Sequence, residues 1–147
     1  MKAFAQAFAG LWHCIKYERH FRVHLTAAVY VLVFAPYFAL SRGQWAALIL
    51  VVALVPAAEL FNTALEAAVD LASPERQPLA KTAKDAAAGA VLLCAIGAVA
   101  VGLILFWQPD VWRAIWTDLW GHWWKSTLLI VSLPVAVWWI AWKWEKK

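Results

Sequence analysis

The chain has 147 residues, of which 65% are hydrophobic and only 15% are charged, and its formal net charge is +4. Soluble domains average about 45–50% apolar and about 25% charged residues, so this composition excludes an ordinary soluble domain. A helix that crosses a membrane needs about 20 mainly apolar residues, and the chain is long enough for several of them. The twelve tryptophans agree, because their amphipathic rings favour the boundary between membrane and water.

The two cysteines, Cys14 and Cys94, lie far apart in apolar surroundings. Neither a disulfide framework nor a zinc site is therefore predicted, and both side chains are expected to serve packing. Residues 2–16 mix Lys, Gln and His into an apolar pattern, with no small-residue cleavage site after them. We therefore expect the chain to enter the membrane through its own helices rather than through a cleavable signal.

The first half of the chain predicts a surface helix and two spans. Apolar residues recur at helical spacing between residues 4 and 15, with polar residues on another face, which predicts an amphipathic helix on the membrane surface. A charged stretch at 16–22 precedes the first span, predicted at 23–40. After a polar turn at 41–44, the second segment starts near residue 45 and stays helical in pattern to about residue 71.

The second half predicts two more spans. Residues 73–78 form a loop by their proline content, and a third span rich in Ala and Gly runs from about 79 to 107. A tryptophan-rich interfacial segment at 110–124 and a fourth span at 126–142 follow. The expected fold is all-α, an integral membrane bundle. Its first domain, 1–109, holds the surface helix and three spans, and its second, 110–147, holds the additional interfacial segment and fourth span.

Lysine and arginine predict the orientation, because they favour the cytoplasmic side of a membrane. They gather at the N-terminus, around the loop after the second span and at the C-terminus, whereas the turns on the opposite side hold Arg42 and a few balanced charges. Both termini are therefore expected in the cytoplasm, as four spans require. The cations on that side are Lys2, Lys16, Arg19, Arg22, Arg76, Lys81, Lys84, Lys143, Lys146 and Lys147.

A polar stripe crosses the cytoplasmic boundary on the second span. At 100° per residue, Glu59, Asn62, Thr63, Glu66 and Asp70 share roughly a third of the helix circumference. A solvated helix end would explain Glu66 and Asp70. It would not explain Glu59, because a carboxylate that follows a long apolar run is costly in lipid and marks a functional or paired position.

Ionisable side chains from two other helices are expected at the same level. Glu18 lies just before the first span, and Lys84 and Asp85 open the third, with Lys81 one turn earlier. Carboxylates that can hold Mg²⁺, a cation for phosphate and a base near an acceptor hydroxyl together favour phosphoryl transfer. The sequence has no Walker A motif and no kinase glycine-rich loop, so a nucleotide site must be built differently.

These residues carry a resemblance. The pattern E-x-x-N-T-A-x-E-x-x-x-D at 59–70, followed by P-L-A-K-x-A-K-D-x-A-A-G-A-V-L at 78–92, is similar to the signature of the prokaryotic diacylglycerol kinase family. Upstream, E-R-x-F-R-x-H at 18–24 resembles the family's approach to the first span. The similarity covers about residues 4–107, and its motifs are long and specific.

The resemblance implies a lipid kinase that uses ATP and Mg²⁺. Glu59 would be the general base toward the lipid hydroxyl, Glu18 and Glu66 would hold the ATP-bound Mg²⁺, and Lys84 and Asp85 would contact the nucleotide phosphates and sugar. The family is homotrimeric with active sites shared between protomers, so a homotrimer is expected. Further implied positions are Gln6, Glu75, Arg76 and Gln77 near the nucleotide, with Asn62 and Asp70 supporting the site.

The chain departs from the family pattern in two places. An arginine that some members carry ahead of the surface helix has no counterpart, Lys2 being the nearest cation, and the fourth span lies outside the usual three-span plan. An extra lipid-facing or trimer-flanking helix is the simplest interpretation of that span. His13, His20 and His24 lack acids at metal-ligand spacing, and His122 falls in the tryptophan belt on the opposite side, so interfacial positions are predicted for all four.

Three functional hypotheses follow. The first is phosphotransfer from ATP to a membrane lipid alcohol in the bacterial cytoplasmic membrane. The motifs at 19–24 and 81–90 look more like the undecaprenol kinase branch than the diacylglycerol kinase branch, so undecaprenol is favoured and diacylglycerol is the alternative. The second is a non-catalytic trimeric membrane scaffold in which the polar stripe only seals the trimer. The third, a small transporter built around Glu59, is disfavoured because the acids cluster at one interface.

Overall fold

The structure is a computed structural model that describes residues 2–73, 77–142 and 144, and nearly all of them are helical. Four of the described helical segments are long and apolar enough to cross a membrane: 19–38, α3, α4 and α6. The predicted all-α membrane bundle is therefore confirmed. The elements are α1 (Lys2–Tyr17), α2 (Arg19–Phe34), the 3-10 helix η1 (Ala35–Phe38), α3 (Arg42–Ala72), α4 (Pro78–Phe106), α5 (Pro109–Gly121) and α6 (Trp123–Ala141).

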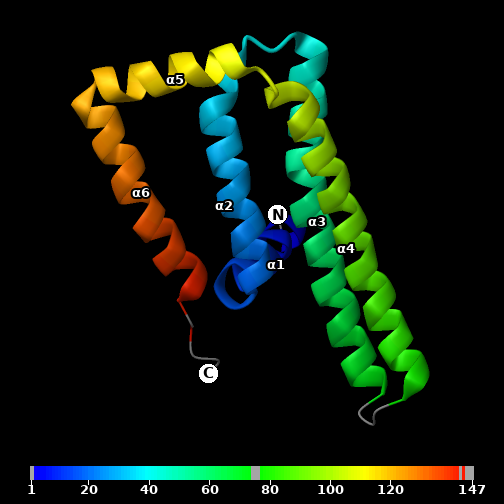
Figure 1. Cartoon of the computed structure of the whole chain (residues 1–147). Coiled ribbons are helices and arrows are strands. Elements are labelled where there is room, and N and C mark those ends of the chain that lie inside the picture. The colour runs from blue at the N-terminus through cyan, green and yellow to red at the C-terminus, as the bar shows by residue number, and fades with distance from the viewer. Residues whose placement is uncertain (1, 74–76, 143, 145–147) are drawn as a thin grey trace.

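The helices are arranged around the long antiparallel pair α3 and α4 (Figure 1). Helix α2 lies beside α3, and α1 lies near the start of α2. At the opposite end of the bundle α5 runs across the helix ends, and α6 then returns toward the start of α2. We call these two levels the α1 end and the α5 end. Helices α3 and α4 continue well past α1, as the long helical pattern of the second span predicted.

The first span changes from an α-helix to a 3-10 helix before it ends, because Pro36 interrupts the α-helical pattern. Proline has no N–H to donate and clashes with the preceding turn, so α2 stops at Phe34 and a 3-10 turn follows. Ala39 then adopts φ 48°, a left-handed conformation that ends the turn. Ser41 caps α3 in a capping box, in which the Gln44 N–H donates to Ser41 Oγ and the Ser41 N–H donates to Gln44 Oε1. Most of the predicted polar turn is thus the first turn of α3.

The best-packed core lies at the α5 end and includes the extension beyond the third span. Phe38 of η1 is buried there, with its ring 4.8 Å from that of Phe106 in α4 and 5.3 Å from that of Trp112 in α5, both edge to face. Such aromatic pairs add about 0.5–1.5 kcal/mol beyond the area they bury. The buried members are Ala35, Phe38, Leu40, Leu48, Leu105 and Ile115.

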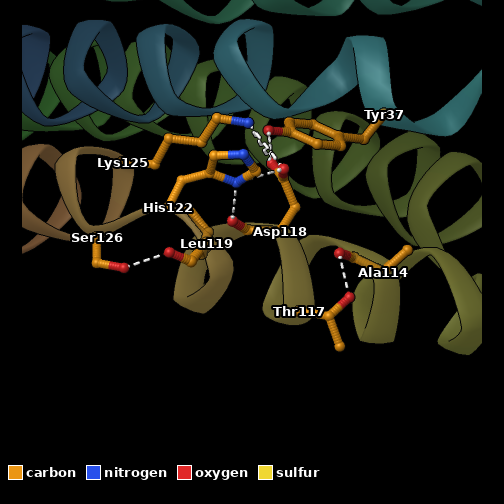
Figure 2. Close-up of polar contacts among 8 residues, drawn as sticks. All are labelled: Tyr37, Ala114, Thr117, Asp118, Leu119, His122, Lys125 and Ser126. Atoms are coloured by element: carbon orange, nitrogen blue, oxygen red, sulfur yellow. Dashed lines mark hydrogen bonds and ion pairs between the residues drawn. The ribbon is translucent and has the colours of Figure 1, made fainter.

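A polar cluster at the same end joins η1, α5 and α6 (Figure 2). The Tyr37 hydroxyl donates to Asp118 Oδ2 at 2.9 Å, and the Lys125 ammonium donates to both carboxylate oxygens at 2.8 and 2.7 Å. His122 Nδ1 lies 3.2 Å from Asp118 Oδ1. The hydrogen bond from Lys125, followed by the one from Tyr37, holds the pKa of the Asp118 carboxyl below its ordinary value. This carboxylate therefore fixes the corner between α5 and α6.

Acidification is expected to loosen this corner. Because the pKa of Asp118 is lowered in the folded state, its contribution to stability is present above the ordinary value of 3.8 and is lost as the pH falls through the lower, folded-state pKa. We expect the melting temperature of the detergent-solubilised protein to fall as the pH drops below about 4, and to fall less in Asp118→Asn. Asp110→Asn, which removes a fully exposed pair with Arg113, is the control. Equal acid sensitivity of Asp118→Asn and the parent protein would contradict this assignment.

Candidate functional site

The polar stripe predicted on the second span lies on α3 at the α1 end. Glu59 is buried, with 9% of its surface exposed. Asn62 and Glu66 are half-buried, and Asp70, nearer the end of the helix, is exposed. Exposure therefore rises along α3 from the buried carboxylate of Glu59 to the exposed one of Asp70. This gradient suits a site where an apolar substrate and a water-soluble one approach from opposite directions.

Glu59 has a partner on α2. His24 Nε2 lies 3.2 Å from Glu59 Oε1, and the His24 side chain is itself only 27% exposed. This contact joins α2 to α3 beside the buried carboxylate and restricts the positions that the Glu59 side chain can adopt. The histidine pattern predicted only an interfacial position for His24, because sequence spacing cannot show a contact between two helices.

Helix α1 closes the site from the side. Cys14 of α1 is 5% exposed, and its thiol has the Thr63 side chain as a hydrogen-bond partner and Glu18 and Glu59 as charged neighbours. Burial raises the pKa of Cys14, the two carboxylates raise it further, and the bond with Thr63 acts in the opposite direction. The buried position of Cys14 agrees with its predicted packing role, and the charges of Glu18 and Glu59 act on its thiol.

Two further contacts organise the carboxylates toward the exposed end. Asn62 Nδ2 donates to Glu66 Oε1 at 2.8 Å, which orients the Glu66 carboxylate. Lys84 of α4 pairs with Asp70 of α3 at 2.5 Å from Nζ to Oδ1 and so joins the two long helices. Asn62 Oδ1 is buried and has no hydrogen-bond partner among the described residues. A buried acceptor of this kind beside a carboxylate is suited to a bound water or another donor.

The other predicted site residues differ in how far they are exposed. Glu18 is the half-buried residue between α1 and α2, and Asp85 is exposed on α4. Gln6 is exposed on α1, and Gln77 is exposed as the N-cap residue of α4. Glu75 and Arg76 lie outside the described residues. Within the described ranges, no group of three or more His, Cys, Asp or Glu side chains gathers closely enough to hold a metal alone.

An apolar groove leads toward the buried carboxylate. It lies between α2, α3 and α4, has a volume of about 300 Å³, and is lined largely by small and branched residues. His24 is the one polar side chain among the described residues that line it, and Pro56, one turn before Glu59, lies at the same end. The groove therefore brings an apolar chain close to the His24–Glu59 pair without offering it other hydrogen bonds.

Comparison with known proteins identifies the family of this chain. The sequence profile of the family described as prokaryotic diacylglycerol kinase matches residues 5–106, which is more than half of the chain. The chain belongs to the prokaryotic diacylglycerol kinase family. It is therefore a lipid kinase, and as a kinase it uses ATP as co-substrate. The resemblance predicted from the motifs at 59–70 and 78–92 is confirmed.

Three relatives illustrate the similarity. The chain is 41% identical to the undecaprenol kinase of Bacillus subtilis over 105 residues, which are 71% of this chain and 85% of that protein. It is 44% identical to the diacylglycerol kinase of Synechocystis over 108 residues, 73% of this chain and 62% of that one. The diacylglycerol kinase of Escherichia coli K12 is 34% identical over 108 residues, 74% of this chain and 88% of that protein. The family match ends at residue 106, so α5 and α6 lie outside it.

The His24–Glu59 contact generates a prediction. In His24→Ala the buried carboxylate loses its partner and its fixed orientation, and we expect kinase activity to fall by up to about 100-fold, because a misplacement of about 1 Å at a reacting group can cost that much. Phosphate transfer from labelled ATP to lipid in mixed micelles measures it. His24→Gln, which keeps an N–H donor, should retain more activity, and exposed His20→Ala is the control. Equal activity of His24→Ala and His20→Ala would refute a role for the contact.

Proposed function

We propose that the protein transfers the γ-phosphate of ATP to the terminal hydroxyl of a membrane lipid alcohol, with undecaprenol as the preferred substrate. The observation that carries this proposal is the buried carboxylate of Glu59, which lies 3.2 Å from His24, a side chain that lines an apolar groove. A carboxylate at membrane depth is costly unless it has a function or a partner, and Glu59 is placed to have both.

Glu59 is proposed as the general base. The hydroxyl oxygen of the lipid attacks the γ-phosphorus of ATP while its proton passes to the Glu59 carboxylate. The bond between the γ-phosphorus and the bridging oxygen of the β-phosphate breaks, and ADP leaves with that bond's electron pair. The products are the lipid phosphate and ADP. His24 keeps the accepting oxygen directed toward the groove, and the protein's remaining contribution is positioning.

Glu18 and Glu66 are proposed to hold the Mg²⁺ that accompanies ATP and neutralises phosphate charge. This ion commonly takes one or two carboxylates and completes its shell with phosphate oxygens and water, so a larger cluster of protein ligands is not required. The residues present fit that demand. Asn62 donates a hydrogen bond to Glu66 Oε1 and so leaves Glu66 Oε2 available for the ion. The Asn62 side-chain oxygen has no partner among the described residues and could accept a hydrogen bond from water around the ion.

The nucleotide is proposed to approach along the exposed end of α3 and α4. Lys84, fixed by Asp70, supplies the positive charge for the phosphates, and Asp85 lies next to it for the sugar region. The remaining nucleotide contacts are proposed on the strength of the family resemblance alone. They are Gln6 on α1, Gln77 before α4, and Glu75 and Arg76, which lie outside the described residues.

The groove supports undecaprenol over diacylglycerol. Diacylglycerol carries ester carbonyls close to its hydroxyl, and these need polar partners when they leave water. A polyprenol has only its terminal hydroxyl, which matches a groove whose described lining is apolar apart from His24. The similarity to an undecaprenol kinase also favours undecaprenol. Diacylglycerol is the alternative substrate, because the chain is also similar to diacylglycerol kinases.

The assembly and placement of the chain are part of the proposal. A homotrimer with shared active sites is proposed from the family resemblance, in the bacterial cytoplasmic membrane with both termini in the cytoplasm. The α1 end, which carries the site, would then face the cytoplasm, where ATP is found. Residues 1–109 are proposed as the kinase domain and residues 110–147 as an addition to it.

The decisive test is phosphate transfer from labelled ATP to undecaprenol and to diacylglycerol in mixed micelles. We expect transfer to both lipids, with the higher kcat/KM for undecaprenol, and a loss of about 10²- to 10⁴-fold in Glu59→Gln, the range typical of a general base. The carboxylate variant Asp110→Asn at the α5 end is the matched control. No transfer from a correctly folded parent protein would reject the kinase proposal, and a preference for diacylglycerol would reject undecaprenol as the substrate.

A second test addresses the groove. Ala98 of α4 lines it, so Ala98→Phe should fill part of its volume and raise the KM for lipid while leaving the KM for ATP unchanged. Ala100→Phe, on an exposed face of the same helix, is the control for a bulky residue in α4. If both variants changed lipid KM equally, the groove would not be the path of the lipid chain.

A further inference from the structure

Arg22, in the first turn of α2, is a buried cation whose contacts reach two other helices. Only 3% of its surface is exposed. Its Nη1 donates to the carbonyl oxygens of Lys16 at 2.8 Å and Ile15 at 3.4 Å, in the last turn of α1. Its Nη2 donates to the carbonyl oxygens of Trp142 at 2.9 Å and Ile140 at 3.2 Å, at the end of α6. One guanidinium therefore joins the end of the surface helix to the end of the extension.

The physical basis of this junction is the chemistry of helix ends. The last four carbonyl groups of an α-helix have no partner within the helix, and the C-terminus carries partial negative charge. At the α1 end two such termini meet around one buried cation. The planar guanidinium can donate in two directions at once, which a lysine ammonium on a flexible stem cannot do with the same geometry.

Two aromatic contacts support the same junction from the extension. The Arg22 guanidinium lies 5.9 Å from the centre of the Trp139 ring in α6. The Lys16 ammonium of α1 lies 5.2 Å from the centre of the Trp144 ring. Cations over aromatic faces are attracted to them, most strongly where water is excluded. The C-terminal segment therefore binds the end of α1 directly as well as through Arg22.

The other end of α6 is held independently. The Asp118 cluster fixes the start of α6 to η1 and α5, and the Tyr30 hydroxyl donates to Ser132 Oγ at 2.9 Å between α2 and α6 midway along. These contacts leave an apolar space of about 620 Å³ between α2 and α6. Helix α6 thus spans the bundle from one anchored end to the other (Figure 1).

The junction holds the corner between α1 and α2, where Glu18 lies. This residue alone separates α1 from α2, its N–H donates to the Cys14 carbonyl at 2.9 Å, and its carbonyl accepts from the Arg22 N–H at 3.3 Å. Any movement of the end of α1 relative to α2 must therefore move Glu18. Arg22 bridges this corner from the first turn of α2 to the last turn of α1.

We propose that the α5–α6 extension is an internal clamp on the surface helix, and that Arg22 is the positioning residue through which it fixes Glu18. The clamp itself follows from the contacts above. Its consequence for catalysis rests on the proposed role of Glu18 in holding the Mg²⁺ of ATP. The extension then restricts the movement of α1 at the membrane surface and so fixes the position of Glu18 on the nucleotide side of the site.

Cys14 provides a readout that does not depend on activity, because it is buried beneath α1. In a Cys94→Ala background, its alkylation by a water-soluble maleimide reports how often α1 lifts away. We expect Trp139→Ala to raise that rate about tenfold, the factor expected for a cation–π contact in a partly desolvated site. Arg22→Lys should raise it as well. Val137→Ala, an exposed position on the same helix, is the control and should leave it unchanged.

Kinetics of the same variants test positioning. We expect the apparent KM for Mg·ATP to rise several-fold in Trp139→Ala and Arg22→Lys while the KM for lipid stays constant, a division that general loss of folded protein would not produce. If Cys14 were alkylated no faster in Trp139→Ala and Arg22→Lys than in Val137→Ala, the clamp would be overturned. Exposure of Cys14 with unchanged KM for Mg·ATP would overturn the positioning of Glu18. A parent protein without kinase activity would reject the proposed function, while the labelling result would still decide on the clamp.

Discussion

A carboxylate at the depth of Glu59 can be kept in a membrane protein only if protein groups rather than lipid surround it. Most of the geometry at the α1 end serves this requirement. His24 approaches from α2, Cys14 of α1 covers the side, and the helix continues beyond Glu59 so that its more exposed acids reach water. The apolar groove reaches His24, the partner of Glu59. A buried carboxylate and an apolar groove thus lie close together in the packing of α1, α2, α3 and α4.

The bundle has two centres with different chemistry. At the α5 end, α5 and α6 follow the part of the chain that matches the family. Aromatic packing around Phe38 and the ion pair of Asp118 with Lys125 hold these two helices in place. At the α1 end, polar side chains are less completely paired, as the unpartnered Asn62 Oδ1 shows. Incomplete pairing is expected at a site that binds substrates, since those groups find partners only when the substrates are bound. The well-packed end is therefore the support, and the polar end is the proposed site.

The extension alters this family plan without entering the groove. Its tryptophans are largely exposed, as expected for side chains that face lipid and the membrane boundary, but Arg22 and Trp139 bring its end to the surface helix. The prediction of an extra lipid-facing or trimer-flanking helix did not include these contacts, in which the final residues of the span accept hydrogen bonds from Arg22.

The sequence by itself determined the membrane class, the number of spans and the acidic face of α3, because hydrophobic length and helical periodicity are local properties. Its motifs at 59–70 and 78–92 also identified the family. Only the tertiary structure decided that His24 contacts Glu59, that Lys84 pairs with Asp70 and that Arg22 joins α1 to α6. These contacts link helices whose relative rotation and distance depend on packing. Arg22 and the carbonyls of α6 are separated by more than a hundred residues, and no spacing rule relates them.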